Sequence, residues 1–351
     1  MHNRRKKPIS EAERKRQRDR EAGQIVEYRA LVQQLMAARK LGSTDLALIP
    51  LIDQATQWNP DFYTAWALRR DILHANVFSN GSVEEKMACI KQELKCTEKA
   101  IRDHPKSYWV WGHRRWALEV SPEPLWKGEM TLVGMMLELD PRNFHGWDYR
   151  RFLLSRLEAD QDPSTVLSLL RTEYAYTEKK ISQSFSNASA WHHRSKLFPR
   201  LLADQVDNPT SFLHTLDHEF SLIHNAMYTD PSDQSAWMYY QWLIKASDLP
   251  SLPGEKEEEG MGQRQRQRAR SEYAKLQELL ELLEEKERIW PLHLLLWMHQ
   301  QGLVSHHDEE TVASDRVVTI LQELITLDPS RQGRYKDLLQ SSPIPAPSDR
   351  T

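Results

Sequence analysis

The sequence predicts an all-α fold built from repeated helical hairpins, and three observations support this prediction. The 351-residue chain contains only 12 glycines, whereas Leu, Glu, Lys, Arg and Gln, which favour helix, are abundant. Tryptophan recurs with similar neighbours at intervals of 36 to 46 residues. Apolar residues between these tryptophans return near helical spacing. We therefore expect a solenoid of six to seven helical hairpins, each too small to bury its apolar face alone.

Five segments are expected along the chain. They are a basic N-terminal segment (1–22), helical repeats one to five (23–247), a low-complexity polar loop (248–272), C-terminal helical repeats (273–342) and a disordered tail (343–351). The loop is predicted to be disordered because its composition is polar and repetitive. The basic start has nine Lys or Arg in its first twenty residues; acidic residues break this run and favour a solvated helix, although an acidic partner or nuclear import is an alternative.

The repeat is defined by a tryptophan with fixed neighbours. The five copies carry Trp66, Trp111, Trp147, Trp191 and Trp237. Arg follows three residues later at Arg69, Arg114, Arg150 and Arg194, with Tyr240 in the fifth copy. Proline stands six residues before the Trp in four copies, where it ends one helix and begins the next. An apolar residue seven positions after the Trp shares its helix face, so both are expected to be buried scaffold. Tyr335 occupies the Trp position of a last copy.

Composition excludes several classes of partner. With 47 basic and 50 acidic residues the net charge is −3, so no global field would recruit nucleic acid or a membrane surface. No stretch reaches the length of a transmembrane span, and no secretory signal is visible. Cys89 and Cys96 are seven residues apart in a helical pattern, too far to bridge. We expect a cytoplasmic protein without an intrachain disulfide.

A complete catalytic apparatus is not visible in this chain. Cysteines with zinc spacing, a nucleophile elbow and a phosphate-binding loop are all missing, so we expect no metal or cofactor to be bound by this chain alone. Lys106, Tyr108, His113 and His145 nevertheless fall at turns or helix starts of neighbouring repeats. Such a group suits an anionic, phosphate-like ligand. The alternative is that they are a surface lysine and half-buried aromatic residues.

One string in the second repeat resembles a known family. Pro-Lys-x-Tyr-x-x-Trp-x-x-Arg-Arg, which here begins at Pro105 and ends at Arg115, is similar to the repeat of protein prenyltransferase α subunits. The resemblance spans most of the chain, from about Asn59 to the copy at Tyr335. It implies a right-handed α–α superhelix wrapped around a β subunit that carries the catalytic zinc and the isoprenoid cavity.

Within that family the chain resembles the Rab-type geranylgeranyltransferase α subunits. The resemblance rests on the Met-His-x-Arg start (Met1 to Arg4) and on the strings that begin at Asn143 and Phe185. It implies an enzyme active only as a heterodimer with a β subunit. That enzyme transfers geranylgeranyl from geranylgeranyl diphosphate to C-terminal cysteines of Rab GTPases presented by a Rab escort protein.

The resemblance also implies roles for three residues. Lys106, Tyr108 and His145 would face the diphosphate at the β-subunit interface, where negative charge grows on the leaving oxygens. His2 is a separate hypothesis: because imidazole is a good zinc ligand, an N-terminal His close to the partner's zinc would occupy its open ligand position; the alternative is a disordered terminus.

Two other readings of the sequence stay open. One is the α subunit shared by farnesyltransferase and the CaaX-type geranylgeranyltransferase, whose repeats have the same Lys-x-Tyr and Trp-x-x-Arg patterns. The other is a non-catalytic tetratricopeptide-like scaffold, although the repeat here is longer than 34 residues. The sequence does not indicate which Rab proteins are modified or which residues contact the escort protein.

Overall fold

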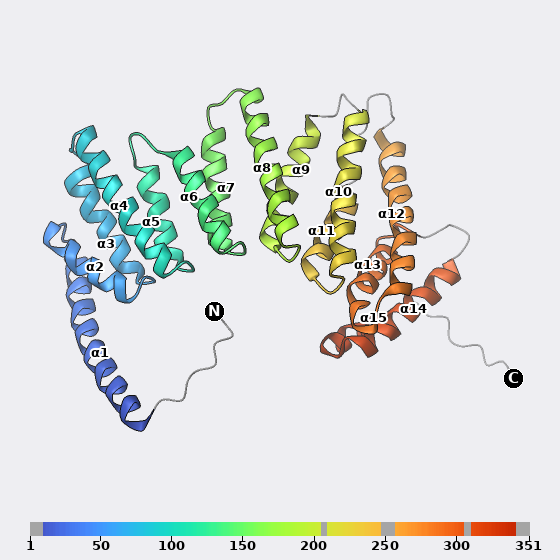
Figure 1. The fold of residues 1–351 in the computed structure, drawn as a ribbon, viewed down its shortest axis with the longest axis horizontal. Coiled ribbons are helices and arrows are strands. Elements are labelled where there is room, and N and C mark those ends of the chain that lie inside the picture. The colour runs from blue at the N-terminus through green and yellow to red at the C-terminus, as the bar shows by residue number, and fades with distance from the viewer. Residues whose placement is uncertain (1–9, 205–208, 247–256, 305–309, 342–351) are drawn as a thin grey trace. The chain divides into compact units, whose positions relative to one another are not determined.

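The computed structural model describes residues 10–204, 209–246, 257–304 and 310–341 (Figure 1). Within these ranges the side chains of 209, 257–265 and 310–314 are not described. The chain divides into two compact units, Met1–Leu157 and Glu158–Thr351. All regular elements of the described ranges are helices. The predicted all-α repeat fold is therefore confirmed.

The first unit contains a long N-terminal helix and three hairpins. α1 (Glu11–Lys40) starts at a capping box in which the Ser10 and Glu13 side chains bond each other's backbone N–H groups. The hairpins pair α2 (Ile49–Trp58) with α3 (Tyr63–Leu73), α4 (Val83–Asp103) with α5 (Tyr108–Glu119), and α6 (Trp126–Leu139) with α7 (Phe144–Glu158). The short helix η1 (Leu46–Leu48) leads into α2, and the π-helical η2 (His74–Phe78) continues α3.

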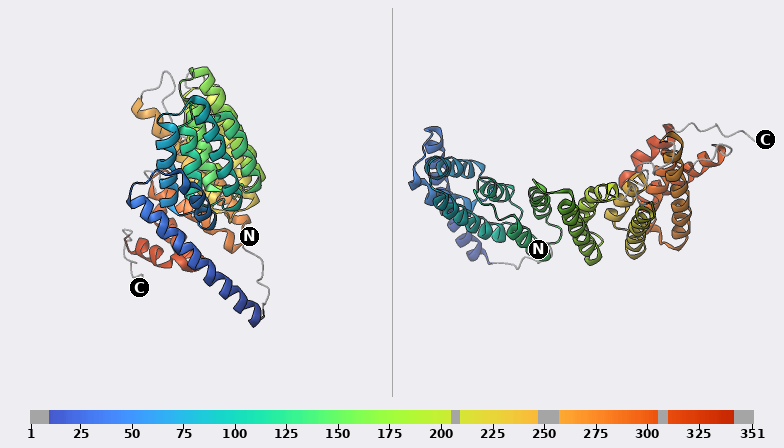
Figure 2. Two further views of the ribbon diagram at one scale, coloured as in Figure 1. Left: turned by 90° about the vertical axis from the view of Figure 1, so that its left-hand side faces the viewer. Right: turned by 90° about the horizontal axis from the view of Figure 1, so that it is seen from above.

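The second unit contains four hairpins. They pair α8 (Pro163–Gln183) with α9 (Ala188–Ala203), α10 (Pro209–Thr229) with α11 (Gln234–Ala246), α12 (Glu257–Leu282) with α13 (Ile289–Gln300), and α14 (Glu310–Leu327) with α15 (Gln332–Ser341). The 3₁₀ helices η3 (Glu285–Glu287) and η4 (Pro329–Arg331) precede α13 and α15. Figure 2 shows the helices of each unit from two further sides. The described residues thus contain seven helix pairs, which agrees with the six to seven predicted.

A hydrogen bond explains the link between the repeat proline and the repeat tryptophan. In each of the five copies the indole Nε1 donates to the main-chain oxygen six residues earlier, at 2.7 to 2.9 Å. That oxygen belongs to proline in four copies and to Phe185 in the fourth repeat. All five tryptophans are buried, as predicted. The bond gives the carbonyl at the turn a donor from the following helix, so it fixes the turn against the second helix of its own hairpin.

The repeat arginines join successive hairpins. Arg69 on α3 forms two hydrogen bonds, of 2.6 and 2.8 Å, with Glu93 on α4. Arg114 on α5 pairs in the same way with Glu129 on α6, at 2.8 and 2.7 Å, and Arg194 on α9 pairs with Glu219 on α10. All three arginines are buried. A planar guanidinium matches a carboxylate with two parallel bonds, which fixes the second helix of one hairpin to the first helix of the next.

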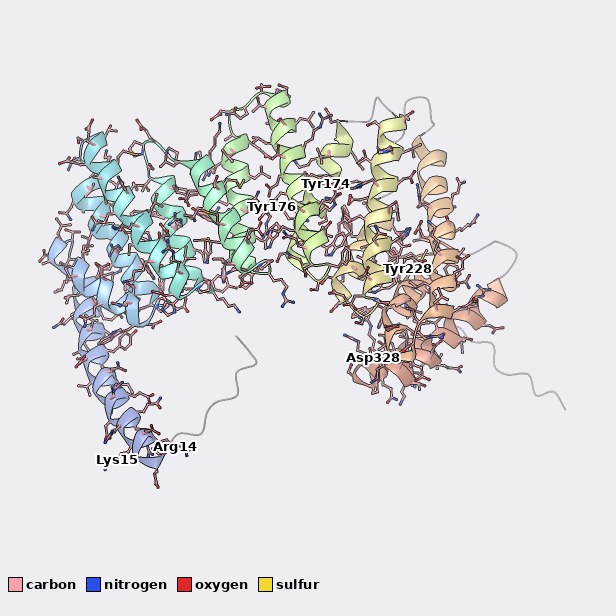
Figure 3. All side chains as sticks on the ribbon, viewed as in Figure 1. Arg14, Lys15, Tyr174, Tyr176, Tyr228 and Asp328 are labelled. Carbon is pink, nitrogen blue, oxygen red and sulfur yellow. The ribbon has the colours of Figure 1, made fainter. Side chains whose placement is uncertain are left out.

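The same buried carboxylates bond back to their own hairpin. The residue two positions after the Trp reaches the glutamate: His113 Nε2 lies 2.7 Å from Glu93, and the Tyr149 hydroxyl donates to Glu129 at 2.7 Å. In the second unit the Tyr239 hydroxyl of α11 donates to Glu219 at 3.2 Å. Glu219 also bonds Tyr174 of α8 in the preceding hairpin, labelled in Figure 3, and the Arg194 guanidinium lies 3.6 Å from the centre of the Tyr174 ring. Each carboxylate therefore holds two or more partners in place.

The predicted disordered loop over residues 248–272 is wrong for its second part. Residues 247–256 lie outside the described residues, but α12 begins at Glu257 and runs through the rest of that range. The reason is tertiary: Glu272 is fully buried and accepts hydrogen bonds from Tyr240 and from Lys275 at 2.8 Å. Tyr240, which replaces the repeat Arg, thus meets a glutamate on the next hairpin as the arginines do. The tail 343–351 lies outside the described residues.

Across the described ranges, the search for a helix long and apolar enough to cross a membrane finds none.

Candidate functional site

The turns before α5 and α7 are held together by side chains at their centres. Ser107 Oγ donates to Asp61 Oδ1 at 2.7 Å, which ties the α5 turn to the preceding hairpin. Asn143 Nδ2 donates to the Pro105 main-chain oxygen at 3.0 Å. The Oδ1 atom of Asn143 also accepts from the backbone N–H of His145 at 3.0 Å. Lys106 therefore stands in a turn whose backbone is fixed from both neighbouring repeats.

Tyr108 and His145 meet at the start of these helices. Their ring centroids lie 4.3 Å apart in an edge-to-face arrangement. Phe144 adds a third ring, 5.8 Å from Tyr108 and 4.0 Å from His145. Tyr108 is 65% exposed and Phe144 50% exposed, while His145 is buried beneath them. Exposed aromatic rings at helix starts, supported by a buried ring, form a preorganised surface for another molecule.

A hollow of about 420 Å³ opens beside this aromatic group. Its lining includes Tyr108 and His145 together with Arg115 and Arg151, about two turns further along α5 and α7. The Arg115 guanidinium lies 4.0 Å over the Phe152 ring, and Arg151 Nη2 lies 3.3 Å from Asp148 Oδ1. The hollow therefore combines phenol and imidazole groups with two cationic side chains.

The structure places Lys106 next to this hollow but not in its lining. The Lys106 side chain is exposed, and its ammonium makes no hydrogen bond or ion pair with the described residues. Burial lowers the pKa of His145, while the nearby Lys106 main-chain oxygen acts in the opposite direction. His145 is therefore neutral at physiological pH. The positive charge available to a ligand comes from Lys106, Arg115 and Arg151.

His113 does not belong to this group, so its predicted place among the anion ligands is wrong. The ring is fully buried and bonded to Glu93, and burial lowers its pKa. From the sequence, both His113 and His145 are expected near a helix start. Only His145 lies two residues before its repeat Trp. His113 lies two residues after its Trp, on the face that packs inward.

Arg115 and Arg151 are the residues that sequence reasoning left without a role. Both stand four positions after a repeat Trp, a position that is also Arg in the first copy, at Arg70. The sequence feature that could have identified them is the Arg-Arg doublet that follows the Trp. The first arginine of the doublet is buried, and the second lies about 100° further around the helix. His2 lies outside the described residues. Within the described ranges, no group of three or more His, Cys, Asp and Glu side chains is arranged to hold a metal ion.

Comparison with known proteins identifies the repeat. A family model described as "Protein prenyltransferase alpha subunit repeat" matches residues 90–120, 126–157, 170–201 and 216–247. A solved structure of Candida albicans protein geranylgeranyltransferase-I complexed with GGPP superposes with a TM-score of 0.60, 18% identity and 90% coverage of both chains. At that identity the likeness shows the fold alone. Together with the helical hairpins, the family-model match identifies the repeats of this chain as protein prenyltransferase α-subunit repeats.

More similar relatives narrow this assignment. The geranylgeranyl transferase type-2 subunit alpha of Schizosaccharomyces pombe is 34% identical, over 94% of this chain and 95% of the relative. That of Saccharomyces cerevisiae is 31% identical, over 97% and 99%. The rat protein of the same name is 39% identical over 70% of this chain, but the match spans only 42% of the rat chain. The chain belongs to the geranylgeranyl transferase type-2 α subunits.

Proposed function

We propose that this chain, paired with a β subunit, forms an enzyme that transfers geranylgeranyl from geranylgeranyl diphosphate to C-terminal cysteines of Rab GTPases presented by a Rab escort protein. The observation that carries the proposal is the end-to-end match to two type-2 α subunits, combined with the cationic and aromatic hollow at the α5 and α7 helix starts. The mammalian relatives extend well beyond the matched region, so the proposal concerns the part that they share with this chain.

In this proposal the zinc and the isoprenoid cavity belong to the β subunit, where the metal activates the cysteine thiolate of the substrate. This chain supplies groups for the departing diphosphate. Lys106 offers an ammonium with no competing carboxylate among the described residues, and the first turn of α5 adds the positive end of its helix dipole. Both stabilise the negative charge that develops on the leaving oxygens.

Tyr108 and His145 have different parts in this arrangement. The Tyr108 hydroxyl is exposed beside the hollow and can donate to a diphosphate oxygen. His145 is buried, neutral and edge-on to the Tyr108 ring. It therefore acts as a positioning residue that fixes the phenol. Its Nε2 atom is buried and makes no hydrogen bond with the described residues. The cytoplasmic location of the protein stays a prediction. The two cysteines, Cys89 and Cys96, are free thiols in the structure.

The test is co-expression with a type-2 β subunit or, separately, with a CaaX-type β subunit. We expect a 1:1 complex and prenylation of a Rab protein, in the presence of escort protein, only with the type-2 partner. Assembly and activity with the CaaX-type partner instead would overturn the Rab-type assignment. Failure with both would favour a non-catalytic scaffold.

A further inference from the structure

Helix α13 contains a further copy of the repeat, although it lacks the repeat Trp. The positions that line the hollow on α5 are three before the Trp, the Trp itself, and one and four after it: Tyr108, Trp111, Gly112 and Arg115. The same spacing on α11 gives Gln234, Trp237, Met238 and Gln241, and on α13 it gives Trp290, His293, Leu294 and Trp297. His293 thus replaces the repeat Trp. All eight of these α11 and α13 residues line one pocket in the second unit.

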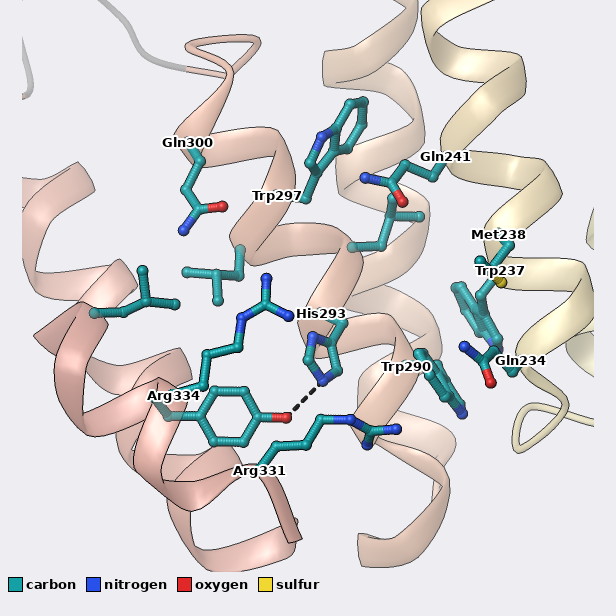
Figure 4. Close-up of a pocket in the computed structure, with 14 residues that line it drawn as sticks. Gln234, Trp237, Met238, Gln241, Trp290, His293, Trp297, Gln300, Arg331 and Arg334 are labelled. Atoms are coloured by element: carbon teal, nitrogen blue, oxygen red, sulfur yellow. Dashed lines mark hydrogen bonds between the residues drawn. The ribbon is translucent and has the colours of Figure 1, made fainter. Parts of the chain in front are cut away.

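This pocket has a volume of about 270 Å³ and lies between α11, α13 and α15 (Figure 4). Its apolar wall includes three indole rings, those of Trp237, Trp290 and Trp297. Arg331 and Arg334 also line the pocket, and the Arg331 guanidinium lies 5.4 Å from the centre of the Trp290 ring. Although acidic residues outnumber basic ones in the whole chain, none of the fourteen described residues that line the pocket is Asp or Glu. The pocket is therefore cationic in a chain of negative net charge.

The two arginines of the pocket differ in whether the guanidinium already has a carboxylate partner. Arg331 Nη1 lies 2.7 Å from Asp328 Oδ2. Asp328 also accepts a 2.6 Å bond from Tyr335 Oη, which lies 2.7 Å from His293 Nε2, the dashed contact in Figure 4. The Asp328 carboxylate is thus already used within the fold. Arg334 is exposed and has no ion pair with the described residues, so it is the cation left for a ligand.

We infer that this pocket anchors an acidic segment of the β subunit, with a carboxylate at Arg334 and an adjacent apolar side chain against the indole rings. Two observations support the inference: the lining residues occupy equivalent positions of the repeat, and the pocket is positively charged. In a hairpin repeat, equivalent positions of successive copies form one kind of contact surface, and in the first unit these positions line the hollow assigned above to the β-subunit interface. A guanidinium favours a carboxylate through paired hydrogen bonds. Tryptophan rings favour an apolar anchor at an interface.

The inference rests on the proposed function, and its test separates the two. The heterodimer is prepared with the type-2 β subunit and this chain carrying Arg334→Glu, and the subunit dissociation constant is measured at two salt concentrations. Lys336→Glu is the matched control because Lys336 is exposed on the same helix, changes charge equally and does not line the pocket. We expect Arg334→Glu to weaken assembly by at least about tenfold, with a smaller loss at high salt, and Lys336→Glu to change it little.

A second measurement does not depend on affinity. A photo-crosslinking residue replaces Met238, which is 61% exposed in the pocket lining, and the crosslinked β peptide is mapped by mass spectrometry. We expect a peptide that contains Asp or Glu beside an apolar residue. If the unmodified chain does not bind the β subunit, the proposed function fails. If it binds and prenylates Rab, but Arg334→Glu assembles as tightly as Lys336→Glu or the crosslink reaches no acidic β segment, the inference fails and the function stands.

Discussion

The indole Nε1 of Trp147 donates a 2.8 Å hydrogen bond to the main-chain oxygen of Pro141, six residues earlier. The indole is fully buried, so one side chain both fills the core of its hairpin and satisfies the carbonyl at the turn. The four other copies contain the same bond. The tryptophan is therefore the central structural residue of each repeat, and its loss should be felt through both packing and hydrogen bonding.

We predict that Trp147→Ala lowers the free energy of unfolding by about 3 to 5 kcal/mol, the usual cost of removing a buried aromatic ring. Trp147→Phe keeps most of the ring but removes the indole N–H that donates to the Pro141 carbonyl, and should cost about 1 to 3 kcal/mol through the lost hydrogen bond and the lost packing. Urea denaturation checks both values. Trp58→Ala is the control because Trp58 is 39% exposed. Equal losses for Trp147→Ala and Trp58→Ala would contradict a scaffold role.

The Arg114 to Glu129 pair offers a test of how hairpins are joined. Arg114→Met leaves the buried Glu129 carboxylate with only Tyr149 as a hydrogen-bond partner among the described residues, and should cost about 3 to 5 kcal/mol. Replacing both residues by Met removes the unpaired charge, so the double variant should recover much of that loss. Arg102→Ala, in an exposed pair with Glu98, should cost less than about 1 kcal/mol. A double variant less stable than Arg114→Met would refute this account.

Stability should fall in acid because of the buried carboxylates. Burial alone would raise the pKa of Glu93, but hydrogen bonds from His113 and Arg69 outweigh it and lower the pKa to about 2. A pKa below the unfolded value means that the stabilisation is present above about pH 4.5 and is lost as pH falls toward 2, on the order of 3 kcal/mol for this group. Measuring the free energy of unfolding against pH checks this. Glu93→Gln should flatten that part of the curve; an unchanged slope would show that other groups dominate.

Lys106→Ala should lower single-turnover prenyl transfer by roughly 10-fold to 1000-fold, the scale of losing one donor that stabilises developing charge. The heterodimer should assemble normally because the Lys106 side chain is exposed. Lys127→Ala, another exposed lysine in the same unit, is the control for a change in overall charge. An unchanged single-turnover rate for Lys106→Ala would remove this residue from the diphosphate site.

Backbone amides over residues 268–280 should be protected from hydrogen exchange, because this part of α12 packs through Glu272 and Leu276, both buried. Tyr240→Phe removes the hydroxyl that donates to Glu272 and should reduce this protection, with a cost of about 1 to 3 kcal/mol. Tyr228→Phe is the control because Tyr228 is 53% exposed. Exchange over 268–280 at the rate of an unstructured peptide would restore the loop that the sequence predicted.

Much of the candidate site could be predicted from local sequence. The Pro-Lys-x-Tyr string marks a helix start, and the recurrence of the Trp register brings Tyr108 and His145 to equivalent places on neighbouring helices. The cationic pair Arg115 and Arg151 was left without a role because a doublet of arginines does not reveal which member is buried. Only the carboxylate partners, on other helices, decide that.

The sequence by itself determined the all-α class and the Trp register, and it limited the number of hairpins to six or seven, because helical spacing and proline placement act over a few residues. The tertiary structure decided which charges are buried. Glu93, Glu129, Glu219 and Glu272 stand 15 to 32 residues beyond the Arg or Tyr that each accepts from, at no fixed interval, so no local pattern announces them. For that reason a polar run ending at Glu272 predicts disorder in isolation, whereas its part from Glu257 folds as helix, where Tyr240, His224 and Lys275 together satisfy the buried Glu272 carboxylate.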